Sequence, residues 1–155
     1  MVKLLILDVD GVLTDGTISY DPFGREVKFF NVKDGYGIVR AIKSGITVAV
    51  VSGRFSWQVE KRCRELGITE IHQGVVNKEE LYRSLKEKYS LSDREVAAMG
   101  DDLPDLPVLR AAGISGAPAD AVPQVKVVVD FVSRREGGRG AVREFIDYLL
   151  EREGE

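Results

Sequence analysis

Short, β-branched apolar runs alternate along the chain with longer segments in which apolar residues recur every three or four positions. The short runs predict buried strands and lie at residues 2–9, 47–51, 96–99 and, more weakly, 127–132. The longer segments predict amphipathic helices and lie at residues 35–43, 56–66, 77–89 and 141–152. This alternation predicts an α/β fold with a doubly wound, mainly parallel sheet, whose ligands bind beyond the carboxyl ends of the strands.

One segment interrupts the alternation directly after the first predicted strand. Two short extended stretches, 17–20 and 27–30, flank the turn sequence Asp-Pro-Phe-Gly-Arg at residues 21–25. They predict a β-hairpin flap over about residues 16–31, which would project over the strand ends. Because a two-stranded ribbon is marginally stable alone, we hypothesise that the flap pairs with copies of itself.

Composition fits one globular domain, which we place at residues 1–155. The chain is 44% hydrophobic and 30% charged, and its 155 residues can form a core without disulfides or structural metals. One cysteine, Cys63, and one histidine, His72, exclude a disulfide framework and a Cys/His zinc site of four ligands. A net charge of −3 and the lack of a membrane-length apolar run favour a cytoplasmic protein that binds neither nucleic acid nor membranes.

Two carboxylates end the first predicted strand. Asp8 and Asp10 are two positions apart, so on a strand they share one face and lie roughly 6.6 Å apart, about the width of a phosphoryl group. At that distance two unit charges repel by roughly 2.5 kcal/mol with an effective dielectric constant of about 20. The pair either begins a turn and caps the next element or binds a ligand at the edge of the sheet.

Two further segments are candidates for anion binding. Ser52, Gly53 and Arg54 follow the second strand and offer a hydroxyl, a backbone amide open to close approach and a guanidinium. The same residues are also ordinary turn chemistry. Asn77 predicts a helix N-cap, and a cation at the next position, Lys78, is unfavourable unless an anion lies nearby. A stray surface lysine is the alternative.

Acidic residues also follow the third strand, in the sequence Gly100-Asp101-Asp102-Leu103-Pro104-Asp105. One carboxylate is enough to cap the helix expected near Pro104. With Asp8 and Asp10, the others form an all-oxygen cluster that selects a hard cation, and Mg²⁺ is the usual one where phosphate also binds.

The Gly/Arg-rich tail and the last helix occupy about residues 133–152. The tail is by default a solvated loop. Its arginines, Arg139 among them, could instead close over an anionic substrate.

Taken in order, Asp8-x-Asp10, Ser52, Lys78 and the acidic 100–105 segment resemble the four motifs of the haloacid dehalogenase superfamily of phosphohydrolases. More closely, the chain is similar to the 3-deoxy-D-manno-octulosonate 8-phosphate (KDO 8-phosphate) phosphatases, small members without a cap domain. The segments that carry this similarity are 8–16, 30–35, 52–54 and 137–144. The resemblance implies a Rossmann-like fold and a place in lipopolysaccharide sugar biosynthesis.

The resemblance also implies a mechanism, the Mg²⁺-dependent hydrolysis of a sugar-acid phosphate through an aspartyl phosphate. Asp8 would be the nucleophile, and Asp10 would act first as general acid and then as general base. Asp8, the backbone carbonyl of Asp10 and Asp101 would hold the metal, while Ser52 and Lys78 would bind the phosphoryl oxygens.

Other residues would support this chemistry. Asp102 and Asp105 would orient the surroundings of the metal or Lys78. The resemblance further implies a homotetramer in which the flaps meet centrally and a neighbouring subunit and the tail enclose each site. The candidate contacts to the phosphorylated sugar acid are Gly53, Arg54, Lys33, Asp34 and Arg139.

Three alternatives remain open at the level of the sequence. A receiver-type signalling module has a similar fold and acidic pocket, but its phosphate acceptor is an Asp where this chain has Ser52. A non-catalytic relative could bind phosphate or serve in assembly. Within the enzymes, a phosphatase of a nonulosonate (sialic-acid type) 9-phosphate is the rival to the KDO 8-phosphate phosphatase.

Overall fold

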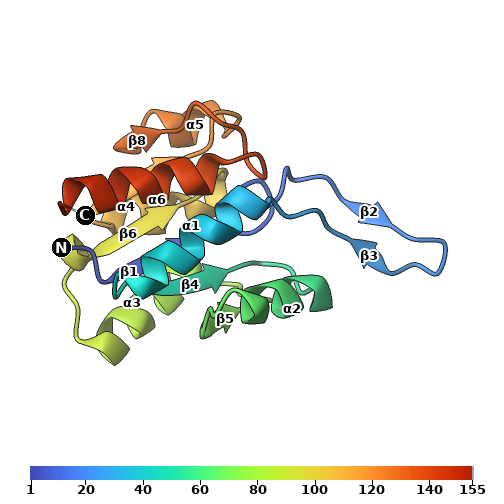
Figure 1. Cartoon of the computed structure of the whole chain (residues 1–155), viewed down its shortest axis with the longest axis horizontal. Coiled ribbons are helices and arrows are strands. Elements are labelled where there is room, and N and C mark those ends of the chain that lie inside the picture. The colour runs from blue at the N-terminus through green and yellow to red at the C-terminus, as the bar shows by residue number, and fades with distance from the viewer. Residues whose placement is uncertain (155) are drawn as a thin grey trace.

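Strand β1 (Leu4–Leu7) is apolar at every position, and all four of its side chains are buried. The computed structural model, which describes residues 1–154, places β1 near the centre of a parallel sheet with the order β5-β4-β1-β6-β7-β8 (Figure 1). The other strands of this sheet are β4 (Thr47–Val51), β5 (Glu70–His72), β6 (Val96–Met99), β7 (Ile114–Ala117) and β8 (Phe131–Val132).

Helices connect these strands and cover both faces of the sheet. The helices are α1 (Val32–Lys43), α2 (Trp57–Glu65), α3 (Lys78–Tyr89), α4 (Leu106–Ala111), α5 (Pro123–Lys126) and α6 (Ala141–Arg152), with single 3-10 turns η1 (Asp93–Glu95) and η2 (Leu103–Asp105). Gly45 and Gly67 lie just beyond the ends of α1 and α2 with φ of +90° and +84°, the left-handed conformation in which glycine commonly ends a helix. None of the helices within residues 1–154 is both long and apolar enough to cross a membrane.

The core has two halves because successive side chains of a strand point to opposite faces of the sheet. Leu5 and Leu7 pack with apolar residues of α1, α2 and α6, and α1 and α6 lie side by side on that face (Figure 1). Leu4 and Ile6 pack with residues of α3, α4 and α5 on the other face. Helices on both faces of a parallel sheet confirm the predicted doubly wound fold.

The flap is a two-stranded antiparallel hairpin of β2 (Ser19–Tyr20) and β3 (Glu26–Val27). Asp21 fixes its turn, because one carboxylate oxygen accepts hydrogen bonds from the backbone N–H of Phe23 at 2.8 Å and of Arg25 at 2.9 Å. The hairpin projects well beyond the rest of the chain (Figure 1). The hairpin predicted after the first strand is therefore present.

The prediction of a strand over residues 127–132 is wrong for most of its length. Pro123 begins the short helix α5, which ends at Lys126, and only Phe131 and Val132 form a strand. Proline favours the first position of a helix, and Val125 buries its side chain completely in this helical turn. The apolar run therefore begins in the turn that follows this helix and ends in a short edge strand.

Strand β7 was not predicted, because its sequence Ile-Ser-Gly-Ala carries little β-branched or large apolar character. Its small residues have a packing reason. A Cβ atom on Gly116 would lie 2.9 Å from the ring of Phe145, so helix α6 can approach the sheet only above a glycine.

Candidate active site

The carboxyl ends of β1, β4 and β6 meet at one edge of the sheet and open into a cleft of about 780 Å³. Its lining contains most of the predicted site residues. They are Asp8, Asp10, Ser52, Gly53, Arg54, Lys78, Asp101, Asp102 and Asp105. The ligand-binding edge is thus where the alternation of strands and helices places it.

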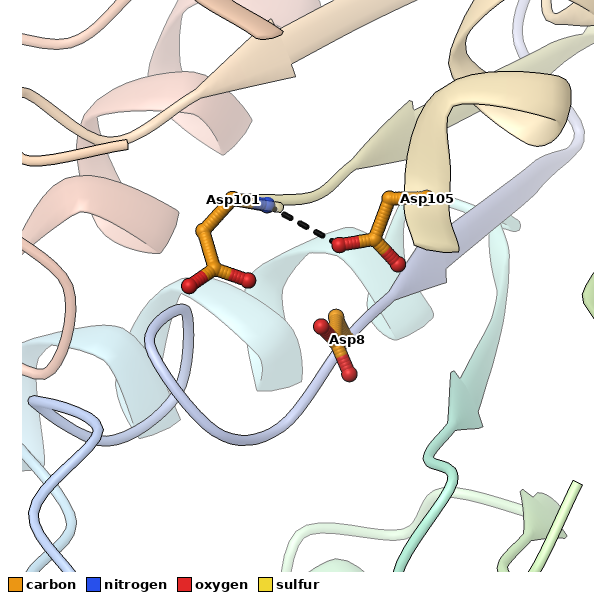
Figure 2. Close-up of side chains that lie close together, drawn as sticks. All are labelled: Asp8, Asp101 and Asp105. Atoms are coloured by element: carbon orange, nitrogen blue, oxygen red, sulfur yellow. Dashed lines mark hydrogen bonds between the residues drawn. The ribbon is translucent and has the colours of Figure 1, made fainter. Parts of the chain in front are cut away.

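Three carboxylates converge at the floor of this cleft (Figure 2). One oxygen each of Asp8, Asp101 and Asp105 can be chosen so that all three lie within 4.8 Å of one another. The Asp105 carboxylate is held in place because it accepts a hydrogen bond of 3.0 Å from the backbone N–H of Asp101 (Figure 2). This all-oxygen set fits a hard divalent cation such as Mg²⁺.

The cluster places negative charge where water reaches it poorly. Burial, and then the nearby Asp105 carboxylate, raise the pKa of Asp8 well above its ordinary range. The same two causes raise the pKa of Asp101 to about 7. A cation beside these carboxyl groups would stabilise their charged forms. The raised pKa values and the all-oxygen donor set therefore both fit a bound divalent cation.

Lys78 supplies positive charge to the same cluster. Its Nζ lies 2.7 Å from Asp105 and 3.3 Å from Asp8, and the side chain is largely buried. Burial alone would lower the pKa of Lys78, but Asp8 and Asp105 outweigh it and raise the pKa above its ordinary value. The anion expected beside a lysine at a helix N-terminus is therefore present, and Asn77 caps this helix by accepting from the backbone N–H of Glu80.

A tight turn follows Asp8 and shapes the cleft. The backbone N–H groups of Val12, Leu13 and Thr14 all donate to the carbonyl oxygen of Val9. Gly11 has φ of +83°, and a Cβ atom there would lie only 1.9 Å from Asp101 Oδ2. Glycine is required at this position by both the backbone conformation and the close approach of Asp101.

Asp10 faces the cleft from this turn, but its side chain does not join the carboxylate cluster. Its Oδ1 lies 2.6 Å from Nζ of Lys28, which comes from the flap. The predicted contact of Asp10 with the metal through its backbone carbonyl remains a prediction.

Ser52, Gly53 and Arg54 form the opposite wall of the cleft. Ser52 is buried, and its Oγ accepts a hydrogen bond of 3.2 Å from the backbone N–H of Arg54. The guanidinium of Arg54 reaches the flap, where Nη2 lies 3.2 Å from Glu26. This wall thus offers the hydroxyl and guanidinium predicted for an anion cradle.

Three predicted contacts lie outside this cleft. Lys33 and Arg139 line a separate groove of about 480 Å³ between the N-terminal ends of α1 and α6. Asp34 is buried, and its Oδ1 accepts a hydrogen bond of 2.9 Å from the backbone N–H of Arg143 in the first turn of α6. Helix α6 begins after Gly140, which has no side chain, so Asp34 provides its cap from helix α1. The structure thus gives Asp34 a structural contact, and its contact with the sugar remains a prediction.

The Gly/Arg-rich tail packs against the turn that carries Asp10. The backbone N–H of Gly138 donates to the carbonyl oxygen of Val12 at 3.0 Å. A Cβ atom on Gly137 would lie 1.9 Å from the carbonyl oxygen of Gly11, so only glycine permits this contact. The glycines of the tail therefore support the active-site turn of the same chain, while Arg139 remains exposed.

Two residues near the cleft were not predicted. Glu26 and Lys28 come from the flap and lie within ion-pair distance of Arg54 and Asp10, respectively. The sequence contains one signal for them, because residues two apart on an extended strand share a face. That signal does not say which side of the flap faces the cleft.

The fold and the site together define a class of hydrolases. In this class a parallel α/β sheet brings four motifs into one cleft: an aspartate after β1, a serine after β4, a lysine at the start of α3 and aspartates after β6. The chain belongs to the haloacid dehalogenase-like hydrolases, and the model of that family matches residues 64–146. This membership sets aside a receiver-type signalling module.

Within this family, the chain is similar to the 3-deoxy-D-manno-octulosonate 8-phosphate phosphatases. It is 50% identical over 153 residues to 3-deoxy-D-manno-octulosonate 8-phosphate phosphatase KdsC of Escherichia coli (strain K12), covering 99% of this chain and 81% of the relative. It is 46% identical over 149 residues to the KdsC protein of Yersinia pestis, covering 96% of this chain and 80% of that one. The expected resemblance is confirmed.

Solved structures agree with this placement. The crystal structure of the phosphatase from Yersinia pestis has a TM-score of 0.94 at 45% identity and covers 97% of this chain and 81% of its own. The Moraxella catarrhalis phosphatase, solved in complex with magnesium ion, phosphate ion and KDO, has a TM-score of 0.94 at 40% identity and covers 97% of this chain and 86% of its own. These similarities extend over nearly the whole chain.

Proposed function

We propose that the chain is one phosphatase domain, residues 1–155, that hydrolyses KDO 8-phosphate to KDO and phosphate with the help of Mg²⁺. The observation that carries the proposal is the convergence of Asp8, Asp101, Asp105 and Lys78 in a cleft at the strand ends. The similarity to KDO 8-phosphate phosphatases over nearly the whole chain supports the choice of substrate.

The first half of the reaction transfers the phosphoryl group to Asp8. A carboxylate oxygen of Asp8 attacks phosphorus in line, and the bond from phosphorus to the sugar oxygen breaks. Asp10 donates its proton to that oxygen, so the sugar acid leaves as an alcohol. Lys78, 3.3 Å from Asp8, stabilises the negative charge of the transferring oxygens.

The second half returns the enzyme to its starting state. Asp10, now a carboxylate, removes a proton from a water molecule that attacks phosphorus. The bond from phosphorus to Asp8 breaks and releases phosphate, and Asp10 again carries a proton for the next turnover. One residue thus serves both halves of the reaction with opposite proton transfers.

Asp8, the backbone carbonyl of Asp10 and Asp101 would hold Mg²⁺ in this cleft. When bound, the ion neutralises charge on the phosphoryl group. Asp105 lies 2.7 Å from Lys78 Nζ and orients that lysine, and Asp102 caps the turn η2 by accepting from the backbone N–H of Leu103. Ser52, Gly53 and Arg54 bind the phosphoryl oxygens and the sugar acid from the opposite wall.

The enzyme assembles as a cytoplasmic homotetramer through its flap in this proposal. The flap exposes large apolar side chains that a monomer would leave in water. They are Ile18, Tyr20, Phe23 and Phe29, and Phe23 is 82% exposed. Pairing of flaps would bury this surface. Lys33 and Arg139, which lie outside the cleft of their own chain, are then free to contact the sugar acid in a neighbouring subunit.

A substrate panel tests the proposal. Phosphate release is measured with KDO 8-phosphate, a nonulosonate 9-phosphate and simple sugar phosphates, each with Mg²⁺ and with EDTA. We expect metal-dependent hydrolysis with the highest kcat/KM for KDO 8-phosphate. A higher kcat/KM for the nonulosonate 9-phosphate would make that ester the substrate in place of KDO 8-phosphate. If folded protein hydrolysed none of the esters, the proposed activity would be overturned.

A further inference from the structure

Lys28 is a buried lysine at the base of the flap. It follows strand β3, and the side chain is only 2% exposed. Its Nζ lies 2.6 Å from Asp10 Oδ1 and 2.9 Å from Glu26 Oε1. Glu26 and Lys28 share one face of the extended chain, which is turned toward the body of the protein, whereas Phe29 between the flap and α1 points outward.

Stability alone does not explain this arrangement. An ammonium group withdrawn from water loses hydration free energy, and its ion pairs only partly offset that loss. Apolar side chains of similar volume often stabilise such positions equally well or better. A charged residue at the base of a projecting ribbon is better explained by its effect on Asp10.

We propose that Lys28 is a positioning residue that holds the Asp10 carboxyl group for proton transfer to the leaving oxygen of the substrate. This inference rests on the proposed function, because it requires Asp10 as the proton donor. Lys28 donates to Oδ1 of Asp10. No hydrogen bond within residues 1–154 engages Oδ2, and this second oxygen is left for the substrate.

Glu26 links this pair to the far wall of the cleft. Its Oε1 accepts from both Lys28 and Arg54, at 2.9 and 3.2 Å. The carboxylate therefore holds the lysine in place and joins the flap to the residues after β4. The orientation of Asp10 is in this way set by the flap rather than by the turn after β1 alone.

The test compares two substrates that differ in their need for a proton donor. The alkoxide that leaves KDO 8-phosphate must be protonated, whereas 4-nitrophenolate leaves 4-nitrophenyl phosphate without that help. The ratio kcat/KM reports only the steps up to loss of the leaving group, so the later role of Asp10 as a base does not enter. For Lys28→Met we expect kcat/KM to fall by about 10²-fold with KDO 8-phosphate and by less than about threefold with 4-nitrophenyl phosphate.

Further variants separate this role from a structural one. Lys28→Arg keeps the charge and should recover part of the loss with KDO 8-phosphate. Lys28→Gln has a polar side chain that tolerates burial, and it should show the same selective loss if Lys28→Met does not fold. Lys3→Met is the matched control, since Lys3 pairs with Glu95 outside the cleft. It should leave kcat/KM unchanged for both KDO 8-phosphate and 4-nitrophenyl phosphate.

The outcomes distinguish the two proposals. Equal losses with both substrates, or no loss with KDO 8-phosphate, in a folded Lys28 variant would overturn the positioning role and leave the proposed function standing. If the wild-type enzyme hydrolyses neither substrate, the proposed function fails and the role of Lys28 fails with it.

Discussion

Nζ of Lys78 lies 3.3 Å from a carboxylate oxygen of Asp8, although the two residues are far apart in the sequence. Asp8 directly follows the central strand β1, and Lys78 begins α3, the helix that follows the edge strand β5. Because all these strands are parallel, their carboxyl ends and the following helix N-termini meet at one edge. The sheet therefore brings the proposed nucleophile to the cation that stabilises its reaction.

Replacing Lys78 with methionine should abolish most activity. The substitution removes the cation beside Asp8 and Asp105, so kcat/KM for KDO 8-phosphate should fall by about 10²- to 10³-fold. Lys86→Met on the same helix is the matched control, because Lys86 pairs with Asp93 outside the cleft. Comparable kcat/KM values for the two variants would contradict the assigned role of Lys78.

Mg²⁺ should stabilise the folded enzyme through Asp101. A ligand at 100 times its Kd adds about 2.7 kcal/mol to the free energy of unfolding, which thermal denaturation detects as a higher Tm. Asp101→Asn should lose this increase, because it removes one of the three converging carboxylates. Asp102→Asn should keep it, since Asp102 caps η2 and lies outside the cluster. An unchanged Mg²⁺ response in Asp101→Asn would place the metal elsewhere.

Asp34 should matter for stability and not for the affinity of the enzyme for its substrate. Asp34→Ala removes the acceptor for the backbone N–H of Arg143 in the first turn of α6. The free energy of unfolding, measured by urea denaturation, should fall by about 1–3 kcal/mol. The KM for KDO 8-phosphate should remain that of the wild type. A stable variant with a raised KM would instead support the contact with the sugar.

Glu70 should make part of the stability depend on pH. Burial alone would raise the pKa of Glu70, but hydrogen bonds from Lys88, Tyr89 and His72 outweigh it and lower the pKa from 4.5 to about 2. Since the folded-state pKa lies below the unfolded one, this stabilisation is complete above about pH 4.5 and is lost as the pH falls toward 2.

The variant Glu70→Gln isolates this contribution. At pH 7 its free energy of unfolding should be about 1.5–3 kcal/mol below that of the wild type, because charge-assisted hydrogen bonds are lost. The difference should shrink in denaturation curves taken between pH 4.5 and pH 2. A difference that stays constant over this range would show that the carboxylate is not ionised preferentially in the folded state.

The main strands and the motif residues could be predicted because both depend on local sequence. The buried run at residues 47–51 forms a strand with the predicted bounds, and so does the run at 96–99. Ser52 follows a predicted strand and Lys78 lies at the start of a predicted helix, so the position of each element also gives the position of the side chain. The parallel sheet then brings these ends together.

Contacts that depend on the path of a loop or on the packing of two distant elements could not be predicted. Lys28 contacts Asp10 from 18 positions away in the sequence, and no local pattern says which side of the hairpin faces the cleft. Asp34 is a polar residue of the kind that contacts ligands, yet the packing of α1 on α6 places its carboxylate at the N-terminus of α6. Strand β7 was missed because its glycine reflects the close approach of Phe145 rather than a local preference.

The nucleophilic role of Asp8 is the central claim, and phosphate release from KDO 8-phosphate by the wild type and by Asp8→Asn tests it most directly. The amide of asparagine is a far weaker nucleophile than a carboxylate. We predict Mg²⁺-dependent turnover by the wild type, loss of that turnover with EDTA, and no turnover by folded Asp8→Asn. Turnover by Asp8→Asn at the wild-type rate would contradict the covalent mechanism.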